Sequence, residues 1–139
     1  TQNHGGEAIL GGAPHEPGAL SYESSVVKNA KDETLVSYAA KVGPVAPLFS
    51  SSTEEDVIER ANNTPFGLAS YFYTRDLAKS WRVSEQLEYG IVGLNTGIIS
   101  TEMAPFGGVK ESGMGREGSK YGIDDYLEIK YISLAGIEE

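Results

Sequence analysis

The sequence predicts an α/β fold. Between Ser52 and Asn95, two segments with the residue spacing of amphipathic helices alternate with two short apolar segments typical of strands. The chain also contains seventeen glycines in 139 residues, which indicates that loops form a large part of it. A chain of this length is expected to form at most one domain with a real hydrophobic core.

Residue patterns in the N-terminal third of the chain predict three short strands. Glu7–Leu10 is an apolar run that ends at two glycines, a pattern typical of a strand followed by a turn. An extended segment is expected over Tyr22–Val27 because it ends in two β-branched valines. Gly43–Ser50 predicts a third strand, and Pro47 places it at a sheet edge because proline has no N–H to donate to a neighbour.

The clearest helix start lies at Ser52. Ser52 is followed three residues later by Glu55, which is the pattern of a capping box, and acidic residues fill the first turn. The helix is expected to end before Pro65, since proline disfavours helical backbone in the residue that precedes it.

A strand, a helix and a second strand are expected next. The aromatic-rich segment Leu68–Thr74 predicts a strand, and Thr74 can cap the helix that follows. Gly90 is expected to stop that helix, and Ile91–Asn95 then predicts a short buried strand. The residues predicted to share one face of the helix are Leu77, Trp81, Ser84 and Leu87 or Glu88.

The chain from Thr96 to Gly118 predicts a long glycine-rich loop, which is uncommon in a compact domain unless it has a function. Its end, Gly113–Gly118, reads GMGREG and matches the G-x-G-x-x-G pattern of dinucleotide-binding turns. That pattern requires a buried strand before the first glycine. Pro105–Ser112 contains a proline, two glycines and two charges, so the dinucleotide-binding interpretation is rejected.

The C-terminal segment Tyr126–Leu134 alternates apolar and charged residues, which predicts a strand with one apolar face.

Composition excludes several classes of function. The formal charge of −9 argues against a surface for nucleic acid or for an anionic membrane. The chain has no cysteine, and His4 and His15 do not form a metal-binding pattern, so we expect no disulfide, thiol nucleophile or metal site. Neither a membrane-spanning run nor a secretory signal is found, so an intracellular protein is expected.

One part of the long loop suits a small-molecule site. The hydroxyls of Ser100 and Thr101 come shortly before Phe106, which lies between Pro105 and two glycines. An aromatic wall with a few polar groups is the usual composition of a ligand pocket. The same residues also fit, and more often form, a packed core with hydroxyls that cap turns.

These residues lie within strings that resemble the C-terminal portion of the aldehyde dehydrogenase superfamily, closest to its succinate-semialdehyde dehydrogenase branch. The resemblance runs from about Glu7 to Ile137, and the pattern PFGG-K-SG-GRE is specific to the superfamily. The matching strings are GPVAPLF, NNTPFGLASYFYTRDL, LEYGIVGLNTGIIS, APFGGVKESGMGREGSKYG and DDYLEIKYISL.

The resemblance implies the α/β fold of the C-terminal part of the aldehyde dehydrogenase catalytic domain. Residues 1–124 would belong to that domain, and residues 125–139 to a terminal oligomerisation strand and tail. Tyr126–Leu134 would extend a sheet across subunits and form a homo-oligomer. A strand folded back onto its own domain is an equal alternative. The glycines of GMGREG would shape a tight connection into a terminal helix.

The resemblance also implies site residues. Phe106 would line the aldehyde channel, and Ser100 would help to hold the far carboxylate of a semialdehyde, to which a hydroxyl can donate a hydrogen bond. In the family a cysteine thiolate attacks the aldehyde, hydride passes to NAD or NADP, and a glutamate acts as base. The cysteine, the glutamate and the substrate-binding arginines would precede residue 1, so no catalytic residue is expected in this chain and the chain alone is expected to be inactive.

The cofactor contacts depart from the family pattern. Where the family has an acid that contacts the nicotinamide ribose and a phenylalanine that supports the ring, this chain has Ala40 and Val42. Tight cofactor binding by this chain is therefore not expected. A non-catalytic interaction or oligomerisation module is the alternative function. The resemblance places an intact enzyme in the cytoplasm, or in the mitochondrial matrix of a eukaryote.

Overall fold

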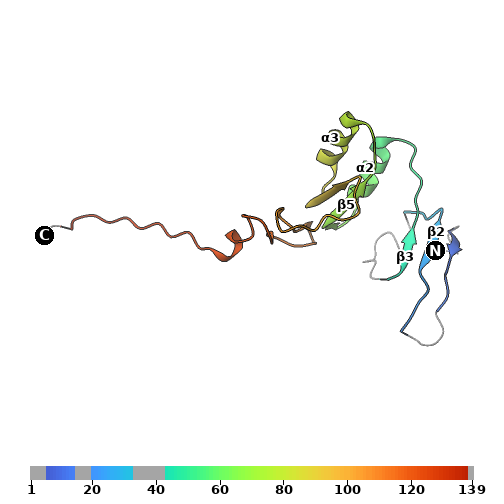
Figure 1. The fold of residues 1–139 in the computed structure, drawn as a ribbon, viewed down its shortest axis with the longest axis horizontal. Helices are drawn as coiled ribbons and strands as arrows, with labels where there is room; N and C mark the ends of the chain where they lie inside the picture. Colours follow the sequence, from blue (N-terminus) through green and yellow to red (C-terminus); the bar gives the residue numbers. More distant parts are fainter. Residues whose placement is uncertain (1–5, 15–19, 33–42, 138–139) are drawn as a thin grey trace. The chain divides into compact units, whose positions relative to one another are not determined.

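A computed structural model describes residues 6–14, 20–32 and 43–137 (Figure 1). The chain divides into two compact units, Thr1–Val57 and Ile58–Glu139, with the boundary inside helix α2 (Glu54–Asn62). Each unit has its own sheet structure. Among the described residues, the fully buried apolar side chains are Val27 and Ala30 in the first unit and Ile58 and Val83 in the second.

The first unit is built on a three-stranded sheet in the order β1-β2-β3. β1 (Glu7–Leu10) pairs antiparallel with β2 (Ser25–Lys28), and β2 pairs parallel with β3 (Val45–Pro47). β3 lies at the edge of the sheet, where the missing N–H of Pro47 costs no ladder bond. The three strands predicted from the sequence are therefore confirmed, within a few residues at their ends.

The N-terminus of α2 differs from the prediction by one residue. The Oγ1 atom of Thr53 accepts a hydrogen bond from the N–H of Asp56 at 3.1 Å, and the Asp56 carboxylate accepts one from the N–H of Ser52 at 3.2 Å. Thr53 is thus the capping residue, and the assignment of a capping box to Ser52 and Glu55 was wrong. Ile58 is the residue that α2 buries.

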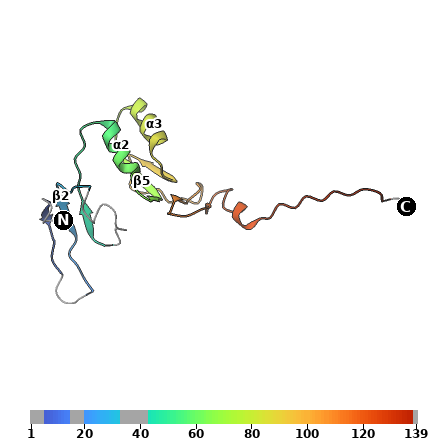
Figure 2. The ribbon, with the colours of Figure 1, turned by 180° about the vertical axis from the view of Figure 1, so that it is seen from behind.

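The second unit contains the predicted strand–helix–strand segment. β5 (Ala69–Phe72) and β6 (Ile91–Leu94) pair in parallel, and α3 (Leu77–Gln86) connects them. Figures 1 and 2 show, from opposite sides, α3 beside β5 and the end of α2. The alternation of strands and helices that predicts an α/β fold is confirmed.

The ends and the buried face of α3 differ from the sequence prediction. Asp76, not Thr74, caps the helix by accepting a hydrogen bond from the N–H of Lys79 at 3.0 Å. The helix ends at Gln86, so Gly90 is not its stop. Val83 is buried, while the predicted face residues Leu77 and Trp81 are 74% and 67% exposed.

The long loop contains a short strand, β7 (Val109–Lys110), that the sequence does not reveal and that pairs antiparallel with a second short strand, β4 (Phe66–Gly67), just before β5. The N–H of Glu111 donates to the carbonyl of Pro65 at 2.9 Å, and the N–H of Gly67 donates to the Ser112 hydroxyl at 2.9 Å. β7 therefore ties the loop to the segment that leads into β5.

The C-terminal segment forms no strand in this structure. A 3₁₀ helix, η2 (Asp124–Tyr126), is followed by residues 127–137 without helix or strand. Leu127, Ile129 and Tyr131 are 59%, 100% and 87% exposed. Of the two alternatives for Tyr126–Leu134, a strand folded back onto its own domain is therefore wrong for the described residues, and pairing across subunits stays a prediction. No helix in the described ranges is both long and apolar enough to span a membrane.

Candidate functional site

A hollow of about 520 Å³ lies on the second unit. It is lined by Ser100, Thr101, Glu102, Phe106, Glu117 and Gly118. The structure therefore brings the two residues predicted to bind substrate, Ser100 and Phe106, to the same hollow. Nothing in the sequence pattern indicates Glu117 or Gly118 as lining residues, because they join the hollow only through the fold of the loop.

Asn95 positions the chain that leads into the hollow. It follows β6 with a φ of 54°, in the left-handed region that asparagine adopts more readily than most residues. Its side-chain amide donates to the Thr74 carbonyl at 2.7 Å and accepts from the Thr74 N–H at 2.9 Å. These two bonds join the turns that follow β5 and β6, and so set the direction in which the chain runs toward Ser100.

Phe106 is held through its backbone. Its N–H donates to the carbonyl of Glu117 at 2.8 Å, and its carbonyl accepts from the N–H of Glu117 at 2.8 Å. The two residues form an isolated antiparallel bridge that closes the loop between them. This bridge brings the two lining segments, residues 100–106 and 117–118, to one place. The Phe106 side chain is partly buried.

The hollow offers an aromatic wall, two hydroxyls and two carboxylates. Thr101 uses its hydroxyl oxygen locally, where it accepts a hydrogen bond from the N–H of Met103 at 3.3 Å. Glu102 and Glu117 give the lining a negative charge. An anionic ligand would therefore need positive charges from outside these lining residues. The full sequence contains no cysteine, so a thiol nucleophile would also have to come from elsewhere.

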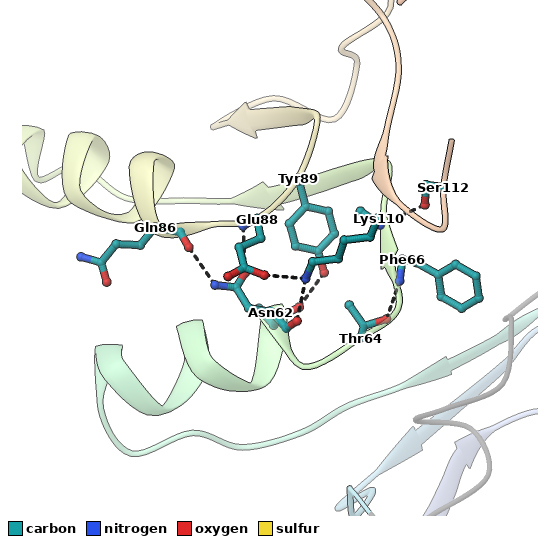
Figure 3. A network of polar contacts seen from close by, with 10 residues as sticks. Asn62, Thr64, Phe66, Gln86, Glu88, Tyr89, Lys110 and Ser112 are labelled. Atoms are coloured by element: carbon teal, nitrogen blue, oxygen red, sulfur yellow. Dashed lines mark hydrogen bonds and ion pairs between the residues drawn. The ribbon is translucent and has the colours of Figure 1, made fainter. Parts of the chain in front are cut away.

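A polar network anchors the base of the loop to both helices (Figure 3). The ammonium group of Lys110 donates to the carbonyl of Asn62 at 2.8 Å and forms an ion pair with Glu88 at 2.7 Å. The Asn62 amide donates to the carbonyl of Gln86 at 2.7 Å and accepts from the N–H of Glu88 at 2.9 Å. Lys110 therefore joins β7 to the end of α2 and to the turn that follows α3.

Tyr89 belongs to the same network. Its hydroxyl donates to the carbonyl of Ala61 at 2.7 Å. Burial raises the pKa of Tyr89 above its usual value, and the nearby positive charge of Lys110 partly opposes that rise.

The GMGREG segment is a tight connection. The backbone φ angles of Gly113, Gly115 and Gly118 are 128°, 78° and 71°, values that residues other than glycine rarely adopt. Turns and the single 3₁₀ turn η2 follow Gly118, so the expected terminal α-helix is not formed in the described residues. Ala40 and Val42 lie outside the described residues, and their effect on cofactor binding stays a prediction.

Comparison with known proteins gives a consistent result. A profile described as "Aldehyde dehydrogenase family" matches residues 1–132. A glutarate-semialdehyde dehydrogenase of Pseudomonas aeruginosa is 56% identical over 133 residues, which is 96% of this chain and 28% of that protein. An NADP(+) succinate-semialdehyde dehydrogenase of Escherichia coli is 55% identical over 94% of this chain and 27% of its own.

The fold matches as well. A crystal structure of succinate-semialdehyde dehydrogenase from Burkholderia pseudomallei superposes with a TM-score of 0.90 at 51% identity, and the match covers 94% of this chain and 27% of that one. The chain thus spans 28% and 27% of the lengths of the two relatives from Pseudomonas aeruginosa and Escherichia coli.

Proposed function

The chain belongs to the aldehyde dehydrogenase family, and on that premise we propose that it is part of an NAD(P)-dependent enzyme that oxidises succinic semialdehyde to succinate. The observation that carries this proposal is the hollow in which Ser100 and Phe106 meet. The names of the relatives support the substrate class, since they act on the semialdehydes of succinate and glutarate. The residues 1–124 would belong to the catalytic domain.

In this proposal the hollow binds and orients the semialdehyde. Phe106 would pack against its short carbon chain, and the Ser100 hydroxyl would donate a hydrogen bond to its carboxylate. Because Glu102 and Glu117 repel that carboxylate, cationic side chains from other parts of the enzyme would have to balance them. The reactive aldehyde carbon would then face a thiolate that these 139 residues do not contain.

The nicotinamide cofactor would accept a hydride when bound. The positions that the resemblance places beside it, Ala40 and Val42, lie outside the described residues and carry no charged group for ribose hydroxyls. Other parts of the enzyme would therefore hold most of the cofactor. We expect the 139-residue chain alone to bind NAD or NADP weakly and to oxidise no aldehyde.

The intact protein from its native source tests the function. We expect a mass well above 14.9 kDa, and formation of NADH or NADPH that depends on succinic semialdehyde. Ser100→Ala should raise KM for succinic semialdehyde by about tenfold, because a hydrogen bond to a charged group is lost. The same variant should change KM for butanal little, since butanal has no carboxylate.

Two results would contradict the proposal. The first is an intact protein without turnover on any short semialdehyde. The second is a native mass of 14.9 kDa, which would favour the interaction module instead. Turnover by the isolated 139 residues would overturn the requirement for an external thiol.

A further inference from the structure

Residues 105–112 carry Phe106 and form the aromatic wall of the hollow. This segment is held at Phe106 by the backbone bridge to Glu117 and at its base by Lys110 and Ser112. At the base, Lys110 and Ser112 bond to residues around β4 and the two helices, as Figure 3 shows. Phe106 itself is followed by Gly107 and Gly108, and consecutive glycines have more backbone freedom than any other pair. The bridge to Glu117 holds the backbone of Phe106 itself, and a further contact is needed to fix the two glycines that follow it.

Arg116 supplies that contact. Its Nη1 atom donates to the carbonyl of Gly108 at 2.8 Å and to its neighbouring carbonyl, that of Gly115, at 2.7 Å. Gly108 is buried and Arg116 is partly buried, so these bonds are partly shielded from water. The guanidinium thereby ties the chain just after Phe106 to the chain just before Glu117.

The backbone of Arg116 is also fixed. Its N–H donates to the Asp125 carboxylate at 2.9 Å. Gly107 lies so close to this segment that a Cβ atom there would come within 2.8 Å of the Arg116 side chain. Arg116 is therefore held at its backbone and packed along its side chain, which suits a residue that transmits position rather than one that reaches for a ligand.

We propose that Arg116 is a positioning residue that holds Phe106 in the wall of the hollow. Both carbonyls bond to the same nitrogen, Nη1, whose position is set by the planar guanidinium, and the flexible ammonium of a lysine is not held there in the same way. The effect of Arg116 on the rate of aldehyde oxidation rests on the proposed function. Its effect on the conformational order of the backbone at Phe106 does not, and that order can be measured without any substrate.

The first test is hydrogen exchange in the intact protein. The amide of Phe106 bonds to Glu117 and should be protected, and Arg116→Gln should speed its exchange by about tenfold. Arg75→Gln is the matched control, because Arg75 is an exposed arginine in the turn between β5 and α3. Unchanged exchange at Phe106 in Arg116→Gln would overturn the inference, whatever reaction the protein catalyses.

The second test is kinetic. Arg116→Gln should lower kcat/KM by about 100-fold, as expected when a contact surface shifts by about 1 Å. The loss should be equal for succinic semialdehyde and for butanal, because Phe106 contacts the carbon chain of both. Arg116→Lys should recover only a small part of the activity. In a Phe106→Ala protein, Arg116→Gln should have little further effect.

The outcomes separate the inference from the proposed function. If Arg116→Gln lowers kcat/KM for succinic semialdehyde but not for butanal, Arg116 binds the substrate carboxylate directly. If Arg116→Gln causes the full loss of kcat/KM also in the Phe106→Ala protein, Arg116 does not act through Phe106. Either result overturns the inference. If the unsubstituted protein oxidises no aldehyde, the proposed function fails, and the exchange measurement alone decides the role of Arg116. Circular dichroism confirms that each variant is folded.

Discussion

Tyr89 shows how burial and charge act together on one side chain. Its hydroxyl is tied to the Ala61 carbonyl, and burial raises its pKa more than Lys110 lowers it. A raised pKa means that the folded state keeps the proton after the unfolded state has released it. The contribution of Tyr89 to stability is therefore complete below about pH 10, and it is lost as the pH rises from there through the folded-state pKa.

The substitution Tyr89→Phe tests this linkage. At pH 7 it should lower stability by about 0.5–1.5 kcal/mol, because the hydrogen bond to Ala61 is lost. Above pH 10 the variant should lose less further stability than the unsubstituted protein, since it has no proton to retain. The midpoint of thermal unfolding of the intact protein from pH 7 to 11 measures both effects. Tyr126→Phe, at a side chain that is 83% exposed, is the control.

Some residues of the candidate site can be predicted from the sequence, and others cannot. Ser100 and Phe106 are close in the chain, so their meeting in one hollow follows from local sequence. Glu117 and Arg116 join them only because the loop closes through a backbone bridge and glycines with positive φ. Backbone bonds of this kind depend on conformation and not on residue type, and sequence patterns therefore do not report them.

Helix capping shows the same limit at the scale of an element. Ser52 with Glu55 is the capping box predicted from the sequence, and Thr53 stands at the same spacing from Asp56. The sequence thus predicts the helix start to within one residue, and the same spacing recurs one residue later. The structure selects Thr53, whose hydroxyl accepts from the Asp56 N–H.

The two capping assignments can be told apart by mutation. Thr53→Ala should destabilise the helix start by about 1 kcal/mol, because it removes a side-chain acceptor from the N-terminus. Ser52→Ala should change stability by less than about 0.5 kcal/mol, since Ser52 contributes its backbone N–H, which alanine keeps. Hydrogen exchange of the Asp56 amide in the intact protein gives a local measure. If Ser52→Ala lowers stability more than Thr53→Ala does, Ser52 is the capping residue and the assignment to Thr53 is wrong.

The strands divide by length. β5 and β6 are four residues each and carry enough apolar and aromatic side chains to be predicted. β4 and β7 are two residues each, too short for any period-two pattern, and so the sequence does not predict them. Tyr126–Leu134 has the strand pattern but finds no partner among the described residues.

At the scale of the whole molecule, we expect the C-terminal segment to join subunits into a homo-oligomer. Residues 125–139 remain our proposed oligomerisation strand and tail, in which the exposed Leu127, Ile129 and Tyr131 would form one apolar face. Ile129→Lys should place a charge in that interface and shift the intact protein toward smaller species. Light scattering after size-exclusion chromatography measures the mass.

Glu128→Gln is the matched control, because alternation places Glu128 on the opposite face of the strand. It should leave the mass unchanged. If Ile129→Lys also leaves the mass unchanged at micromolar concentration, residues 125–139 do not hold the subunits together.

All six residues that line the hollow lie between Ser100 and Gly118, on one uninterrupted stretch of chain. In the proposed enzyme, this part of the substrate-binding surface is encoded by one short run of codons. A single recombination event can therefore exchange it while strands β5 and β6 and helix α3 are inherited unchanged. Divergence of substrate preference within a lineage would then be recorded as short blocks of sequence change rather than as substitutions scattered over the gene.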